Sequence, residues 1–356
     1  MRRPYLCQIE LAQFMNAPIA EKCHKVHKIG WMAALLAGAL VLGACGHRGE
    51  VLSNPARKPI TIYVIGYQQD SAFWSAEQQG AEQAARDFHV NVRYEAPQHA
   101  STQGMIQLSA AAIAAHPYGL LLDYLDHGMY APTLRALNAG IHVVLYNNNL
   151  FYPRAGGATT NPRVTQLPYV GQDNAPGPHG SGAVLMAAFM RYLQPHAHLL
   201  VLNPFPQAFV STMRFAGIQA VAASHGMPVS QLVVNGDEAH NEPIIGAYLQ
   251  AHPHIGGIIG LGTPAANPAA FYVSRHHLHI PIAAFDVDEV AYDNIREGKI
   301  QVALDQQPFL QAYLGVLDLT LEARYGFHPV DINTGNDIVD QANIGQLRRT
   351  IQQGKG

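Results

Sequence analysis

Cysteine is scarce in this sequence, and all of it lies near one end. The three cysteines of the 356-residue chain are Cys7, Cys23 and Cys45. From residue 46 onwards the chain has no thiol that could act as a nucleophile, bind a metal or form a disulfide. Cysteine enzymes, thiolate metal sites and redox motifs are therefore excluded for this part of the chain.

Charge is scarce as well. Charged residues make up 13% of the chain, against about 25% in an average soluble protein, and the formal net charge is -3. A nucleic-acid-binding protein needs a basic face, so we expect no nucleic-acid partner. Hydrophobic residues make up 48% of the chain, which is enough for a large core, and the length fits about two domains.

The short motifs of common enzyme classes are missing. There is no Gly-x-Ser-x-Gly, no His-Glu-x-x-His, no P-loop and no Gly-x-Gly-x-x-Gly after a predicted strand. We therefore expect no catalytic residue, no cofactor and no enzymatic activity. A carboxylate pair such as Asp173 and Asp286 has the chemistry of a glycosidase, but no spacing supports it, and a periplasmic enzyme is the less favoured alternative.

Histidine, in contrast, is abundant, with 19 residues. Two clusters invite a metal-binding interpretation: His252-Pro253-His254 and His276-His277-x-His279. Consecutive histidines on a helix face different directions, and no thiolate or acidic partner lies near them in the sequence. We expect exposed histidine side chains and no metal.

The apolar run near the N-terminus is too short to span a membrane comfortably, which takes about 20 residues. It extends from Ile29 to Leu42 and follows the basic residues Lys22, Lys25 and Lys28. Such a sequence, with small residues before a cleavage site, is typical of a secretory signal peptide, here residues 1–44. Because 28 residues precede the run, Met15 is an alternative start of translation.

The residues Leu42-Gly43-Ala44-Cys45 resemble the bacterial lipobox. The resemblance implies cleavage before Cys45 and transfer of a diacylglyceryl group to its thiol; the alternative is an ordinary cysteine after a signal anchor. Residues 45–59 are polar, with Gly, Pro, Ser and basic residues, and we predict a tether. The protein is therefore expected in the periplasm, held at the membrane by its lipid.

From residue 60 onwards, β-branched runs alternate with alanine-rich helical patterns. This alternation predicts two doubly wound parallel sheets, the α/β class. We expect strands at 61–65, 90–94, 119–122, 142–146, 198–202, 229–234, 257–261, 282–285 and 300–305. We expect helices at 75–88, 102–115, 131–139, 182–193, 212–225, 242–252, 265–276 and 288–297.

An adjacent pair of aromatic residues, Phe73 and Trp74, follows the first predicted strand. In open α/β sheets ligands bind at that edge. The stretch TIYVIGYQQDSAFWSAEQQG, residues 61–80, resembles the opening of the ribose-type periplasmic sugar-binding proteins, in which a paired-aromatic loop joins the first strand to a helix with an early Gly. With gaps, the resemblance extends from about Ile60 to about Ile344.

The resemblance implies a type I periplasmic binding protein fold, with two lobes joined by a multi-strand hinge. The lobes would comprise residues 60–172 plus 307–334 and residues 173–306 plus 335–350. Such a protein captures a monosaccharide or similar polyol between its lobes and presents it to the membrane subunits of an ABC permease. We expect a monomer. The alternative is a receptor that senses its ligand for chemotaxis or for a sensor kinase.

Three further ligand-binding residues are implied by the same resemblance. Arg214 stands in Arg-Phe-Ala-Gly-Ile, Asp286 ends Ala-Ala-Phe-Asp, and Gln306 precedes Pro308 by two residues, as does the hinge Gln of the family. The alternatives are a solvated Arg214 and an Asp286 that caps the following helix, although Asp288 is also available for that role. Together with the aromatic pair, these polar groups suit a sugar, whose faces stack on rings and whose hydroxyls take hydrogen bonds.

The sequence also departs from the family pattern. Asn147 and Asn148 stand where the family has an Asp-Arg pair; amides can still bind hydroxyls, and the alternative is a simple turn. Gly262-Thr263-Pro264 replaces an Asn-Asp pair. Residues 150–168 form a long connection that looks like an insertion. Asp173 is expected to cap the helix that follows it, and the alternative is contact with the ligand. The ligand's identity therefore stays open.

Overall fold

The computed structural model describes residues 59–69, 71–149, 161–175 and 177–355. The predicted signal peptide, Cys45 and all of the predicted tether except Pro59 lie outside these residues, as does most of the predicted insertion at 150–168. Both sheets described below belong to one compact unit of the chain.

The first sheet has the strand order β11-β5-β4-β3-β1-β2, and all of its pairings are parallel. Its strands are β1 (Thr61–Ile65), β2 (Asn91–Glu95), β3 (Gly119–Asp123), β4 (His142–Tyr146), β5 (Tyr169–Gly171) and β11 (Ile332–Asn333). Strand β3 has all five residues buried, which is why Gly119 to Leu122 form a continuous apolar run and not an alternating one.

The second sheet has the order β12-β10-β9-β8-β6-β7, and only β12 runs antiparallel to its neighbour. Its strands are β6 (His198–Asn203), β7 (Val229–Val233), β8 (Ile255–Gly260), β9 (Ile282–Phe285), β10 (Val302–Asp305) and β12 (Asp337–Asp340). Two largely parallel sheets, each wound in both directions from a central strand, confirm the predicted α/β class.

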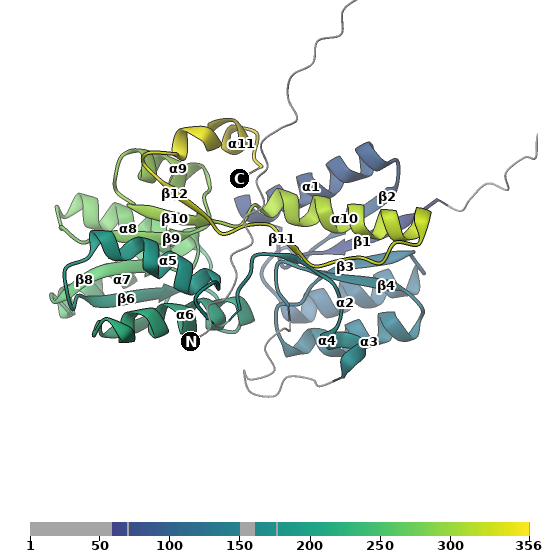
Figure 1. Ribbon diagram of the computed structural model, residues 1–356, viewed down its shortest axis with the longest axis horizontal. Coiled ribbons are helices and arrows are strands. Elements are labelled where there is room, and N and C mark those ends of the chain that lie inside the picture. The colour runs from purple at the N-terminus through teal and green to yellow at the C-terminus, as the bar shows by residue number, and fades with distance from the viewer. Residues whose placement is uncertain (1–58, 70, 150–160, 176, 356) are drawn as a thin grey trace, which may run out of the picture. The chain divides into compact units, whose positions relative to one another are not determined.

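Helices cover the faces of both sheets, as the right-handed crossovers between parallel strands require (Figure 1). They are α1 (Ala72–Phe88), α2 (Thr102–Ala114), α3 (Tyr130–Asn138), α4 (Pro162–Thr165), α5 (Ser181–Phe189), α6 (Phe209–Ser224), α7 (Asn241–Ala251), α8 (Thr263–Arg275), α9 (Glu289–Arg296), α10 (Pro308–Tyr325) and α11 (Arg348–Gln352). Among the described residues, no helix has the length and apolar character needed to cross a membrane.

Helix α1 begins three residues earlier than the sequence pattern predicts, because Ser71 takes the extended N-cap backbone and Ala72 opens the helix. Phe73 and Trp74 therefore lie in the first turn of α1 and not in the loop before it. Strand β3 continues one residue further than predicted, so that Asp123 is its last residue.

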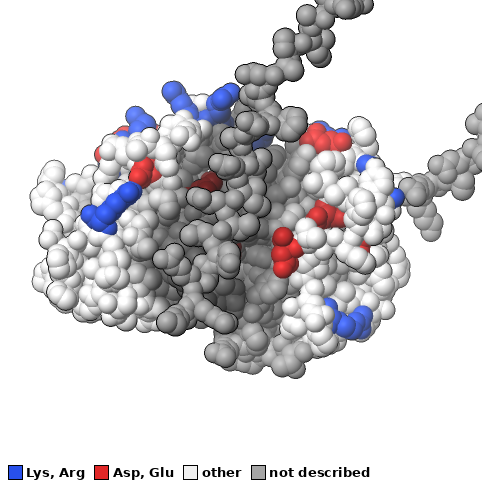
Figure 2. Space-filling model, viewed as in Figure 1, with Lys and Arg blue, Asp and Glu red and all other residues white. Residues whose placement is uncertain are grey.

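The low charge content is visible on the surface. In Figure 2, uncharged residues cover most of the described face, and the Lys, Arg, Asp and Glu side chains are scattered over it.

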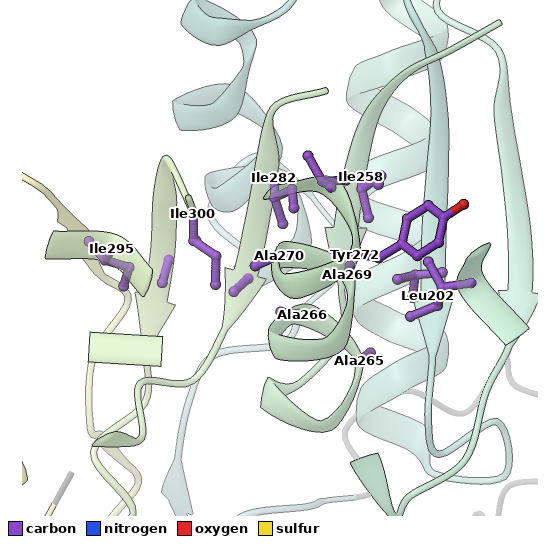
Figure 3. Packing of buried hydrophobic residues seen from close by; sticks show 14 of the residues in the cluster. Leu202, Ile258, Ala265, Ala266, Ala269, Ala270, Tyr272, Ile282, Ile295 and Ile300 are labelled. Carbon is purple, nitrogen blue, oxygen red and sulfur yellow. The ribbon is translucent and has the colours of Figure 1, made fainter. Parts of the chain in front are cut away.

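The core is made of small and branched side chains. Figure 3 shows Ala265, Ala266, Ala269 and Ala270 of α8 facing Ile258 and Ile282 of the second sheet. Such small residues let a helix lie close to a sheet.

The chain passes between the two sheets three times within the described residues: at 172–180, at 306–307 and at 334–336. The connections are hydrogen-bonded to one another. The Thr334 hydroxyl donates to the backbone carbonyl of Gln306 at 2.8 Å, and the side-chain amide of Gln307 donates to the backbone carbonyl of Thr334. The second and third connections are therefore fixed side by side.

Helices α1 and α10 cross closely, and Gly80 makes this possible. A Cβ atom at position 80 would lie 2.1 Å from the carbonyl oxygen of Phe309, which belongs to the backbone and cannot rotate away. We predict that Gly80→Ala lowers the free energy of unfolding by about 2 kcal/mol or more, because the two helices must separate.

Urea unfolding of the purified protein measures this effect. Gly345→Ala is the matched control, because a Cβ atom there meets nothing within 4 Å. If both variants unfold at the wild-type midpoint, the close crossing of α1 and α10 does not constrain the fold.

Candidate functional site

The carboxyl ends of β3 and β4 bring one carboxylate and two amides together. The Asn148 side chain donates from Nδ2 to Asp123 Oδ1 at 2.9 Å, and Asn147 Nδ2 donates to Asp123 Oδ2 at 3.1 Å. All three residues are buried. Asn147 has a left-handed backbone, with φ 57°, which Asn adopts more readily than most residues and which turns the chain at the end of β4. Asn147 therefore makes the turn that the sequence analysis gave as an alternative, and it also belongs to the cluster of polar groups.

Burial raises the pKa of Asp123 from 3.8 to about 7, which the amides of Asn148 and Asn147 partly offset and the nearby charge of Asp126 reinforces. With its two oxygens occupied by amide donors, Asp123 fixes both Asn side chains. Asp123 is a site residue that the sequence analysis missed. The signal was present, since an Asp that ends a run of three Leu residues lies at the ligand edge of a parallel sheet.

A guanidinium is buried at the corresponding edge of the second sheet. Arg214, on α6, is 3% exposed. It donates from Nη2 to Gln172 Oε1 at 2.9 Å and from Nη1 to the Leu261 carbonyl at 3.2 Å, and it stacks over the Phe285 ring at 4.1 Å. The solvated alternative for Arg214 is therefore wrong, because the side chain is buried and bonded to other buried groups.

Asp286 and Gln306 join the Arg214 cluster. Gln306 Nε2 donates to Asp286 Oδ1. Burial raises the pKa of Asp286 and lowers that of Arg214, and the attraction between the two charges opposes both shifts. The cap alternative for Asp286 is wrong, because Asp288 accepts from the Ala291 amide and is the N-cap of α9. Asp286 has φ 69°, a strained value at a strand end of the kind found at functional sites.

The aromatic pair lies beside other rings. The Phe73 and Trp74 centroids are 4.8 Å apart, Trp74 meets Tyr67 edge to face at 5.6 Å, and Tyr67 meets Phe205 of the segment after β6 at 6.1 Å. Trp74 is only 7% exposed and belongs to a core cluster of the first sheet. It is therefore a core residue as well as a candidate stacking residue.

Contacts between the two halves of the chain bring the clusters near one another. Phe209, at the start of α6, donates its amide to the Leu125 carbonyl at 3.2 Å, and Ala208 lies in a core cluster of the first sheet. The Glu77 carboxyl, one turn beyond Trp74, interacts electrostatically with both Asp123 and Asp286. Glu77 therefore lies near both polar clusters, and the sequence analysis did not select it.

Two of the predicted ligand-binding residues have a buried polar atom that lacks a hydrogen-bond partner. These atoms are Oδ1 of Asn148 and Nε of Arg214. Buried polar groups usually have partners, and an unsatisfied one costs about 1–3 kcal/mol. One free acceptor and one free donor belong to residues that the sequence had placed at the ligand edge.

Asp173 does not cap the next helix, and the prediction of that role was wrong. The N-cap of α5 is Gly180, and the Asp173 carboxylate accepts from the Ala175 amide at 2.8 Å. Asp173 lies too far before α5, which begins at Ser181, to occupy the N-cap position. The sequence departs from the family pattern at Gly262. A Cβ atom added at this position would lie 3.8 Å from Asp286 Oδ2.

Two hollows of the described residues, one of about 460 Å³ beside β2 and a smaller one beside β5, are lined by other residues than the predicted ligand-binding ones. Among the described residues, no group of three or more His, Cys, Asp and Glu side chains is arranged to hold a metal. The smaller hollow, of about 270 Å³ beside β5 and β11, is lined by Asn149, Tyr169, Gly171, Asp173, Asp331, Ile332 and Asn333. It includes none of the predicted ligand-binding residues.

Comparison with known proteins identifies the family. The family model described as "Periplasmic binding protein domain" matches residues 62–323. The chain belongs to the periplasmic binding protein family. Membership implies a location outside the cytoplasm, and it confirms the resemblance and the two-lobed fold class drawn from the sequence.

Several similar proteins are sugar-binding proteins. The chain is 23% identical over 312 residues to the xylose/arabinose-binding protein XylF of Sulfolobus acidocaldarius, and the match covers 83% of this chain and 74% of that protein. A carbohydrate transporter of Acidothermus cellulolyticus 11B, solved with myo-inositol, is 26% identical with a TM-score of 0.71, and the match covers 84% of this chain and 100% of the other.

A periplasmic sugar-binding protein of Legionella pneumophila, part of an ABC sugar transporter, shares the fold. It is 24% identical with a TM-score of 0.68, and the match covers 77% of this chain and 99% of the other. The names of these relatives describe a sugar-binding protein and carbohydrate-transport proteins.

Asp123 generates a prediction about pH. Its pKa is about 7 in the folded protein against 3.8 for the free side chain, so the folded state holds this proton more tightly than the unfolded chain does. The contribution of Asp123 is therefore a loss of stability that develops as the pH rises from about 4 to about 7, on the order of 4 kcal/mol. Above pH 7 it stays constant.

Unfolding free energies measured by urea at pH 4 to 8, for the wild type and for Asp123→Asn, test this prediction. Asn cannot titrate, so the variant should show a smaller decline across that range. Curves for the two proteins that run parallel from pH 4 to pH 8 would contradict it.

Proposed function

We propose that this protein is an extracytoplasmic solute-binding lipoprotein that captures a monosaccharide or similar polyol between two lobes and presents it to an ABC permease. The lobes would be residues 60–172 plus 307–334 and residues 173–306 plus 335–350. Its ligand-binding residues would be Phe73, Trp74, Asn147, Asn148, Arg214, Asp286 and Gln306, with Asp123 and Gln172 holding them in place.

The observation that carries this proposal is the balance of polar groups at the carboxyl ends of both sheets. The second-sheet cluster has one cation, Arg214, and one carboxylate, Asp286, and the remaining predicted polar residues are neutral amides. Such a set offers donors and acceptors without a net charge to recruit an ionic ligand. It suits the hydroxyl groups of an uncharged sugar, which both donate and accept hydrogen bonds.

The three connections between the sheets support closure around a ligand. Gln172 in the first connection accepts from Arg214, and Gln306 in the second donates to Asp286. A ligand that contacts these groups from both lobes stabilises the closed arrangement, and hinge closure of this kind is the usual behaviour of periplasmic binding proteins. A permease would recognise the closed form.

A thermal-shift screen of the purified protein tests the function. The panel contains D-xylose, D-arabinose, D-galactose, myo-inositol, a nucleoside and an amino acid. A ligand at 100 times its dissociation constant adds roughly 2.7 kcal/mol of stability, and we expect this from a sugar or inositol without any product being formed. Product formation would favour an enzyme, and no stabilisation by any sugar or polyol would refute the proposal.

Arg214→Lys tests the site within this function. Lysine keeps the charge but loses the planar fork that bonds Gln172 and Leu261 at once. We expect the affinity for the ligand found in the screen to fall about tenfold to a hundredfold, measured by calorimetry. Arg191→Lys is the control, because Arg191 makes an exposed ion pair with Asp340. Equal affinities of wild type and Arg214→Lys would remove Arg214 from the site.

Lipidation is tested at Cys45. If the lipobox resemblance holds, the mature protein begins at Cys45 and carries a diacylglyceryl group on its thiol. Wild-type protein expressed in a bacterial host should partition into detergent, and Cys45→Ala should stay in the aqueous phase. Mass spectrometry of the N-terminal peptide measures the modification directly. An unmodified Cys45 in the membrane fraction would support a signal anchor instead.

A further inference from the structure

Glu77 is a buried acid without a counter-ion. It lies on α1, one turn beyond Trp74, and is 0% exposed. Neither carboxyl oxygen has a partner of acceptable geometry. No cation appears among the groups that influence it: its electrostatic neighbours are Asp123 and Asp286. A buried carboxyl without a counter-ion is costly, so its presence at the ligand edge requires a reason.

Two tyrosine hydroxyls converge on the same place from different strands. Tyr94 is on β2 and Tyr146 on β4, with β1 and β3 between them in the sheet. Both hydroxyls lie over Gly66, just past the end of β1: a Cβ atom at position 66 would be 2.3 Å from Tyr94 Oη and 3.3 Å from Tyr146 Oη. Only glycine leaves room for this meeting, and both hydroxyl oxygens lack a partner of acceptable geometry.

The Glu77 carboxyl lies beside these two hydroxyls. Burial raises its pKa well above 4.5, the charges of Asp123 and Asp286 raise it further, and the hydroxyls of Tyr146 and Tyr94 lower it in part. Burial and the neighbouring carboxylates therefore favour the protonated form of Glu77. In that form it offers one donor and one acceptor, as does each tyrosine hydroxyl.

The Glu77, Tyr94 and Tyr146 side chains lie close to the polar clusters at the strand ends. Tyr146 is followed directly by Asn147, and the Glu77 carboxyl is near both Asp123 of the first sheet and Asp286 of the second. Four carboxyl and hydroxyl oxygens without a partner of good geometry thus lie at the edge where the predicted ligand-binding residues gather. A group that both donates and accepts would satisfy them.

We propose that Glu77, Tyr94 and Tyr146 form a subsite that binds one hydroxyl group of the ligand. This inference rests on the proposed function and adds to it three residues and a chemical preference. A neutral acid and two phenols bind an uncharged hydroxyl well, because each partner can reverse the direction of its hydrogen bond. A ligand with a hydrogen or a methyl group at that position leaves the three oxygen-bearing side chains unsatisfied and binds weakly.

Calorimetry with D-arabinose, D-xylose or myo-inositol, and with the monodeoxy forms of the sugar that binds, tests the subsite. Glu77→Gln keeps one donor and one acceptor and should bind within about threefold of wild type. Glu77→Leu should lose about tenfold to a hundredfold in affinity for the parent sugar. The loss should disappear for the one monodeoxy sugar that lacks the hydroxyl in question, because the variant has nothing left to lose there.

Two further variants keep the test decisive if Glu77→Leu does not fold. Tyr94→Phe and Tyr146→Phe each remove one oxygen and retain the ring, and each should lose about threefold to tenfold for the parent sugar alone. Glu82→Leu, on the exposed face of the same helix, is the matched control and should bind as wild type does.

The outcomes separate the two proposals. If wild type binds a sugar and the Glu77 and tyrosine variants bind every parent and deoxy sugar with wild-type affinity, the subsite is wrong and the proposed function stands. A loss that is equal for the parent and all deoxy sugars also overturns the subsite, since it shows only a structural role. If wild type binds no sugar or polyol, both proposals fall.

Discussion

A buried guanidinium organises the region where the two sheets are joined. Arg214 cannot keep its charge in the interior without attraction and hydrogen bonds to replace water. It finds them in Gln172 of the first connection, in the Phe285 ring and in the nearby carboxylate of Asp286. Asp286 in turn accepts from Gln306 of the second connection, whose carbonyl accepts from Thr334 of the third. One charge is thereby linked to all three places where the chain changes sheets.

The same requirement explains why ligand binding and lobe geometry would depend on one another. Any group that bonds to Arg214 or Asp286 also acts on side chains that belong to the connections. A ligand hydroxyl that reaches the free Nε of Arg214 would therefore change the energy of the connecting segments as well as its own. No long-range pathway is needed, because the contacts are direct.

The buried acids near the first sheet differ from Arg214, because burial favours their protonated, uncharged form. Burial raises the pKa of Glu77 and brings that of Asp123 to about 7. The salt bridges of the described residues involve side chains at least partly open to water. A chain with few charges thus relies at its centre on carboxylic acids and amides, which exchange hydrogen bonds without a large desolvation cost. Sugars are recognised by the same kind of group.

The sequence by itself determined the alternation of strands and helices, because burial on both faces of a parallel sheet leaves continuous β-branched runs that are readable without a structure. It also determined the residue types at the strand ends, such as Asn147, Asp286 and Gln306, since a family resemblance and the geometry of parallel sheets both point there. Only the tertiary structure decided which of these groups meet. Asp123 pairs with two amides, Glu77 lies against two tyrosines from separate strands, and Trp74 is part of the core. These contacts join residues up to several strands apart, and their energies depend on burial and on neighbouring charges, neither of which is written in the local sequence.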